Sequence, residues 1–97
     1  MADSNSMSLD EVLVQFLREN GLEQSVLEQQ IVEAWPRIMG DTVNHLTRSV
    51  EVKDGMLIVY VNSAALKAQL FEHRFELVRR LNEAVGSPVI RDCRILG

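Results

Sequence analysis

The sequence has little cysteine, little proline and few aromatic residues, and these shortages exclude whole classes of protein. The single cysteine, Cys93, cannot close an internal disulfide and forms no pair of thiolate ligands. Only 2 prolines and 5 glycines occur in 97 residues, which excludes collagen-like and low-complexity chains. No apolar run approaches the roughly 18 to 20 residues of a membrane span, and the start, MADSNSMSLDEV, lacks the features of a signal peptide. We therefore expect a cytoplasmic protein without contact to membranes.

What remains is ordinary globular composition, with 46% hydrophobic and 25% charged residues. A chain of this length fits one domain and leaves no room for a second core. The first residues are small and polar and show no hydrophobic period. We expect residues 1–7 to be a disordered N-terminus and residues 8–97 to form a single domain.

The net charge of -4 conceals an uneven distribution along the chain. Residues 1–47 hold eight acids against two bases, whereas residues 48–97 hold eight bases against six acids. The first half is therefore acidic and the second half mildly basic. Both can be solvated faces, but the second half could also meet phosphate.

The N-terminal half shows the period of amphipathic helices. Ser8 and Glu11 form a capping box and Asn20-Gly21 a C-terminal cap, which predicts a helix over residues 9–20. A second, acidic helix is predicted from residue 22, with a kink or restart at Pro36. After Gly40, a short helical turn is predicted over residues 41–46.

The pattern then changes to the alternation of strands. Residues 49–53 and 56–62 are predicted to pair as a hairpin around Asp54-Gly55. The second strand is apolar on both faces, so either both faces are covered or one face is an interface. A long helix is predicted over residues 64–85, capped by Ser63, with Phe71 and Phe75 widening its apolar face. A last strand is predicted over residues 89–96.

This order predicts an α+β fold in two layers, with helices packed on one face of a three-stranded sheet. The long helix connects the second and third strands, so the sheet should be mixed. Trp35 is expected to anchor the core with its indole N–H turned toward a backbone carbonyl.

Residues suited to catalysis are scarce. His45 and His73 belong to no motif and are expected at the surface, while Cys93 is expected to pack as a small hydrophobic residue. No glycine-rich phosphate loop and no zinc spacing occurs. We expect no enzyme activity, no metal and no cofactor.

Two basic stretches could contact nucleic acid, one on the long helix and one around the last strand and the hairpin turn. Acids between the helix positions reduce the local potential, and Tyr60 is the one aromatic residue with an outward parity on the sheet. Binding should therefore be weak, salt-sensitive and indifferent to sequence. The candidate residues are Lys53, Lys67, Arg74, Arg79, Arg80, Arg91 and Arg94.

Four blocks of the sequence resemble the DciA-like family. WPRIMG at residues 35–40, Thr47 and VEVKDGMLIV at residues 50–59 follow its W-x-x-(I/V)-(M/V)-G, T and D/N-G-x-L-x-V pattern. NSAALKAQL at residues 62–70 and LVRRLNEAVG at residues 77–86 are similar to its later blocks, S-x-x-L-x-x-E-L and L-x-x-x-L-N-x-x-x-G. The resemblance covers about residues 9 to 96, and the variants look most like short members from the Bacteroidetes.

The resemblance implies a KH-like fold and a bacterial protein that assists the loading of the replicative helicase onto single-stranded DNA. The GxxG loop of KH modules is absent, so their usual binding groove is not expected. Two alternatives remain open. One is a protein–protein or dimerisation module, monomer or homodimer, whose interface includes Met56, Ile58 and Tyr60; the other is an RNA-binding protein.

Overall fold

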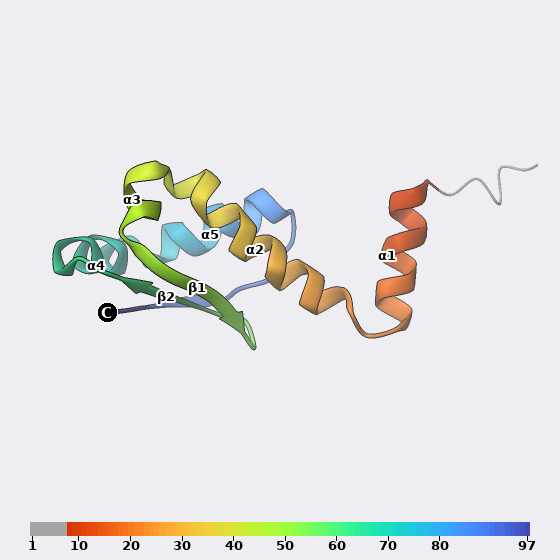
Figure 1. Ribbon diagram of the computed structural model, residues 1–97. Coiled ribbons are helices and arrows are strands. Elements are labelled where there is room, and N and C mark those ends of the chain that lie inside the picture. The colour runs from red at the N-terminus through yellow and green to blue at the C-terminus, as the bar shows by residue number, and fades with distance from the viewer. Residues whose placement is uncertain (1–7) are drawn as a thin grey trace, which may run out of the picture.

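One three-stranded sheet, covered on one face by helices, organises the protein (Figure 1). The computed structural model describes residues 8–97. In chain order the elements are α1 (Leu9–Glu19), α2 (Glu23–Met39), α3 (Asp41–His45), β1 (Thr47–Lys53), β2 (Met56–Val61), α4 (Ala64–Glu72), α5 (Arg74–Val85) and β3 (Asp92–Leu96). The predicted two-layer α+β fold is confirmed.

The strand order β1-β2-β3 makes the sheet mixed, as expected. β1 and β2 are antiparallel and turn at Asp54 and Gly55, whose φ angles of 52° and 80° suit the tight hairpin that Asp-Gly favours. β3 returns parallel to β2 after the two helices α4 and α5. Each central position of β2 therefore has a partner on both sides; Ile58, for example, pairs with Glu51 and with Arg94.

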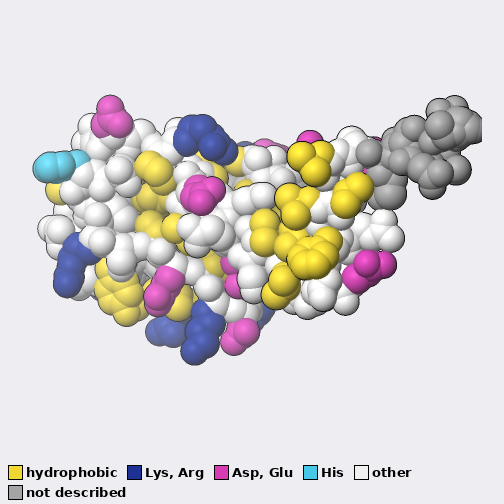
Figure 2. Space-filling model, turned by 45° about the vertical axis from the view of Figure 1, so that its right-hand side comes forward, with side chains coloured by type: hydrophobic (Ala, Val, Ile, Leu, Met, Phe, Trp, Pro, Cys, Tyr) yellow, Lys and Arg dark blue, Asp and Glu magenta, His cyan; other side chains and the backbone are white. Residues whose placement is uncertain are grey.

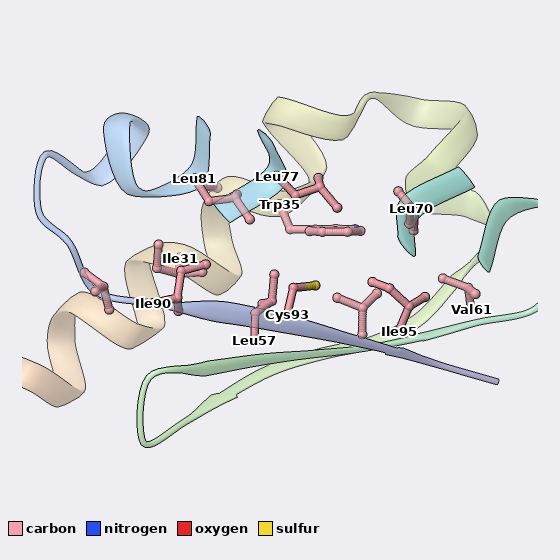
Figure 3. Close-up of a cluster of buried hydrophobic side chains, with 13 residues drawn as sticks. Ile31, Trp35, Leu57, Val61, Leu70, Leu77, Leu81, Ile90, Cys93 and Ile95 are labelled. Carbon is pink, nitrogen blue, oxygen red and sulfur yellow. The ribbon is translucent and has the colours of Figure 1, made fainter. Parts of the chain in front are cut away.

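The core lies between the sheet and the helices, and its side chains rise from β2 and β3 toward α2 and α5 (Figure 3). Trp35 on α2 is fully buried at its centre. Its indole Nε1–H donates to the Thr47 hydroxyl at 3.3 Å, and that hydroxyl donates to the Val43 carbonyl at 2.7 Å. The expected direct bond to a backbone carbonyl is therefore wrong, because the Thr47 hydroxyl stands between the ring and the carbonyl.

The Asn82 side chain on α5 holds the segment that enters β3. Its Oδ1 accepts from the N–H groups of Val89 and Ile90 at 3.0 Å, and its Nδ2 donates to the Ile90 carbonyl at 2.8 Å. These backbone groups are thus bonded to a side chain rather than to a strand. The alternating pattern predicts a start of this strand at residue 89. That prediction is wrong, because β3 begins at Asp92 for this reason.

The predicted restart at Pro36 is wrong, since α2 runs unbroken from Glu23 to Met39 with Pro36 inside it. Proline removes one donor from a helix, but the helix remains stabilised by the burial of Ile31, Ala34 and Trp35 on the same element.

The predicted helix over residues 64–85 is wrong in the opposite sense, because it is broken at His73 into α4 and α5. The His73 backbone leaves helical geometry with ψ at 19°, and the Arg74 guanidinium donates to the Phe71 carbonyl at 3.2 Å. Leu70, Leu77 and Leu81 are buried, but Phe71 and Phe75 are not, which corrects the expectation that they widen the apolar face.

Helix α1 stands apart from the sheet and reaches it only through α2 (Figure 1). Its predicted capping box is confirmed, as the Ser8 hydroxyl accepts from the Glu11 N–H at 3.1 Å. Its end is a Schellman motif, in which the Leu22 N–H bonds to the Leu17 carbonyl and Gly21 takes the left-handed conformation. α1 has no buried residue. Within residues 8–97 no helix has both the length and the apolarity to cross a membrane.

Candidate nucleic-acid interface

Two exposed phenyl rings flank one guanidinium where α4 meets α5. Phe71 and Phe75 are 55% and 68% exposed. The Arg74 Cζ lies 4.3 Å from the centre of the Phe71 ring and 4.5 Å from that of Phe75. Such distances are those of cation–π contacts. We refer to Phe71, Arg74 and Phe75 as the aromatic cluster.

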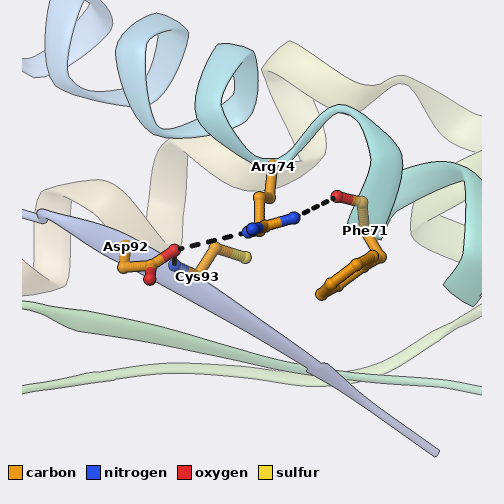
Figure 4. Close-up of polar contacts among 4 residues, drawn as sticks. All are labelled: Phe71, Arg74, Asp92 and Cys93. Atoms are coloured by element: carbon orange, nitrogen blue, oxygen red, sulfur yellow. Dashed lines mark hydrogen bonds and ion pairs between the residues drawn. The ribbon is translucent and has the colours of Figure 1, made fainter.

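The guanidinium of the aromatic cluster is fixed in place by two further contacts (Figure 4). It donates to the Phe71 carbonyl at 3.2 Å and lies 4.0 Å from the Asp92 carboxylate, which itself accepts from the Cys93 N–H at 2.7 Å. The Arg74 side chain is 29% exposed. The cluster is thus attached to the start of β3 and presents its two rings to solvent.

This arrangement suits the binding of an unpaired base. Single-stranded nucleic acid binds by stacking its bases on aromatic rings, while its phosphates contact nearby cations. The cluster supplies two rings and one charge, and Arg79 follows Phe75 by one helical turn on α5.

The structure brings some of the predicted cations together. The Arg91 guanidinium donates to the Asp54 carbonyl and its backbone N–H donates to the Gly55 carbonyl at 2.8 Å. Because Met56 pairs with both Lys53 and Asp92, Lys53 and Arg91 lie at the same end of the sheet.

The other predicted cations are spread over different surfaces. Arg79 pairs with Glu83 at 3.1 Å on the outside of α5, whereas Arg80 lines a hollow with Met39 and Val43. Arg94 lies beside Ile58 in the sheet, and Lys67 lines a separate hollow near Arg48. The seven residues therefore do not form one continuous basic face.

Sequence reasoning missed the two rings as candidate functional residues. It assigned them to the apolar face of a continuous helix, since their spacing of four residues fits such a face. The available signal was the sequence Phe-x-x-Arg-Phe, in which each ring stands within one helical turn of a guanidinium.

The predicted partner interface lies on the face of the sheet opposite the core. Leu57, Val59 and Val61 of β2 point to the helices and are buried, whereas the alternate residues are half-buried. No described helix covers this second face, so internal coverage of both faces is excluded for residues 8–97. The half-buried residues of β2 are Met56, Ile58 and Tyr60.

The histidines and the acids show no arrangement for metal binding in the described part of the chain. His45 and His73 are exposed, as expected. No group of three or more His, Cys, Asp or Glu residues within residues 8–97 could hold a metal ion.

Cys93 is buried and packs in the core, as predicted. Burial raises the pKa of its thiol from the ordinary 9.0 to about 12, and the neighbouring Asp92 carboxylate adds to the rise while Arg74 opposes it. A thiol of this kind remains protonated and unreactive at neutral pH.

Cys93 should accordingly react with Ellman's reagent at pH 8 only when the protein unfolds. Because the folded pKa lies above the unfolded one, the thiol contributes stability below pH 9.0 that is lost as the pH rises toward about 12. We expect the difference in free energy of unfolding between wild type and Cys93→Ala to be constant below pH 9 and to shrink above it. Rapid labelling of the folded protein at pH 8 would contradict this assignment.

Comparison with known proteins identifies the family. The family model described as "Dna[CI] antecedent, DciA" matches residues 8–95. The chain belongs to the DciA family. Its curated relatives are named UPF0232 proteins; that of Mycobacterium bovis is 28% identical over 80 residues and that of Rhodococcus jostii 25% identical over 80 residues. In both cases the match covers 82% of this chain and 43% of the relative, so this DciA-family chain spans less than half the length of those proteins.

Membership of the DciA family confirms the resemblance drawn from the four sequence blocks. The structure explains the Leu-Asn pair in the last of these blocks, residues 77–86. Leu81 is fully buried, and the Asn82 side chain bonds to the segment before β3.

Proposed function

We propose that this DciA-family protein is a non-enzymatic adaptor of DNA replication that acts in the cytoplasm. It contacts the replicative helicase and binds single-stranded DNA weakly at the aromatic cluster. Family membership supports the helicase as partner, and the pair of exposed rings around Arg74 supports the DNA contact.

The expected DNA contact is modest. Two rings can stack one or two bases, and the cations that accompany them are few, because Asp92 lies near Arg74 and Glu83 pairs with Arg79. Stacking does not distinguish one base from another, so binding should tolerate any sequence and fall as salt is raised.

The helicase contact is tested by pull-down of the purified replicative helicase of the same bacterium, in the apo, ADP-bound and ATP-analogue-bound states. We expect association of the wild-type protein, and retention of most of it by the Phe71→Ala/Phe75→Ala variant, whose affinity for DNA we expect to be lower. The absence of association in every nucleotide state would contradict the proposal that this protein contacts the helicase.

A second candidate function is a dimerisation module. The observation that favours it is the uncovered face of the sheet with Met56, Ile58 and Tyr60. Light scattering distinguishes the dimerisation module from the replication adaptor. A wild-type dimer that does not bind DNA, and that Ile58→Asp converts to a monomer, favours the dimerisation module. The RNA-binding alternative is addressed by comparing oligo(dT) with oligo(rU) of equal length.

A further inference from the structure

A second surface, distinct from the aromatic cluster, is an apolar groove between α1 and the first turns of α2. Its volume is about 270 Å³. In Figure 2 the hydrophobic side chains of this region form a patch over α1. Leu13 and Val14 are 53% and 42% exposed there. The apolar floor of the groove consists of Leu13, Val14, Leu17, Val26 and Leu27.

Exposure on this scale is unusual for a helix of a soluble domain. Leu9, Val12 and Phe16 on the same helix are 82%, 49% and 53% exposed. Large contiguous apolar patches on a surface mark interaction sites. Among the described residues, α2 is the element against which α1 packs, and the groove between the two helices is open to solvent.

The charges around the groove indicate the occupant. Asp10 and Glu23 line its edges, and residues 8–30 carry five carboxylates against one guanidinium, that of Arg18. Arg18 is already paired with Glu23 at 3.3 Å, across the corner between α1 and α2. An apolar floor within an acidic rim is complementary to a helix with one apolar face and basic flanks.

The same charges disfavour a second copy of this chain as occupant. Apposing two such arms would bring like charges together around a desolvated centre, which costs free energy. At the corner itself the Schellman motif at Gly21 ends α1, and the Arg18–Glu23 pair joins the two helices.

We propose that the α1–α2 groove binds a basic amphipathic helix of a partner protein. Apolar side chains of that helix at positions i, i+3 and i+4 lie on Leu13, Val14 and Leu17, and its lysines or arginines lie against the acidic rim. This proposal is independent of DNA binding at the aromatic cluster.

The probe for this test is a synthetic 14-residue peptide of leucine and lysine with helical periodicity. Two control peptides accompany it, one with glutamate in place of lysine and one of the same composition with the periodicity scrambled. Binding is followed by NMR titration of the full-length ¹⁵N-labelled protein. We expect shift changes confined to residues 9–30 with the first peptide alone.

Matched variants distinguish binding in the groove from attraction of the peptide to the overall negative charge of the protein. Leu13→Gln should weaken binding of the leucine–lysine peptide about tenfold, because the lost apolar contact is worth roughly 1.5 kcal/mol. Asp10→Asn/Glu23→Gln should weaken it about three- to tenfold, whereas Glu51→Gln/Glu83→Gln, which removes equal charge elsewhere, should leave it unchanged. All are exposed or half-exposed positions, and thermal melts verify that each variant folds.

Three results would overturn the proposal. They are equal binding of the glutamate or scrambled peptide, equal weakening by Glu51→Gln/Glu83→Gln, and light scattering that shows a dimer abolished by Leu13→Gln. The last result would identify a second copy of the chain as the occupant.

Discussion

Replacing Phe71 and Phe75 together by alanine is expected to weaken the binding of single-stranded DNA by at least about thirtyfold. Loss of one stacking ring typically costs about 1–3 kcal/mol, so loss of two amounts to about 2 kcal/mol or more. Fluorescence anisotropy with labelled oligo(dT) measures the change. Because both rings are more than half exposed, the melting temperature should stay within a few degrees of wild type.

The matched control is Phe16→Ala on α1. This phenylalanine is 53% exposed, close to the 55% of Phe71, but lies on a different helix. Its replacement should leave the affinity for DNA unchanged. Equal loss of affinity in the control, or none in the double variant, would remove the aromatic cluster from the proposed function.

Trp35→Ala is expected to destabilise the protein by about 3–5 kcal/mol, the range for replacing a buried Trp or Phe by alanine. The ring lies at the centre of the core and connects α2 to β1 through Thr47. Since a small domain is typically stable by about 5–15 kcal/mol, this variant should unfold at much lower urea concentration or fail to fold.

The contribution of the ring can be separated from that of its hydrogen bond. Thr47→Val removes the hydroxyl that accepts from the indole and donates to the Val43 carbonyl. Because the buried indole N–H then lacks an acceptor, the variant should cost about 1–3 kcal/mol. Urea unfolding monitored by circular dichroism compares both variants with wild type. A loss below 1 kcal/mol for Trp35→Ala would show that the core does not depend on this side chain.

The elements that the sequence predicted well are those bounded by local chemistry. The Ser8–Glu11 box and the Asn20-Gly21 cap define α1, and Asp54-Gly55 defines the hairpin. In each case neighbouring residues satisfy the backbone groups, so a short stretch of sequence contains the information.

The errors occurred where contacts distant in sequence decide the structure. The break at His73 has no glycine or proline, and the Arg74 guanidinium that bonds to the Phe71 carbonyl also lies near Asp92 on β3. The late start of β3 depends in the same way on Asn82. A helical period continues across such a break, which is why periodicity alone predicted one long helix and assigned both phenyl rings to its core face.

The candidate site was predictable only in part. Net basic character of the second half indicated cations, but the distribution of Arg79, Arg80 and Arg94 over separate surfaces depends on the packing of α5 and β3. Exposure of a ring is likewise a property of the folded protein, and it is exposure that distinguishes Phe71 and Phe75 from core residues.

The parallel pairing of β2 with β3 has a consequence for the order of events during synthesis. Leu57 cannot pair with Cys93, its neighbour in the sheet, before Cys93 is synthesised, and the core lacks Val89, Ile90 and Ile95 until residues 89–95 emerge. Local elements such as α1 and the hairpin can form early, but the sheet closes only after the chain has passed through both helices of the crossover. A nascent chain halted before residue 92 therefore exposes one side of β2 as an unpaired edge, which makes it a substrate for chaperones or proteases.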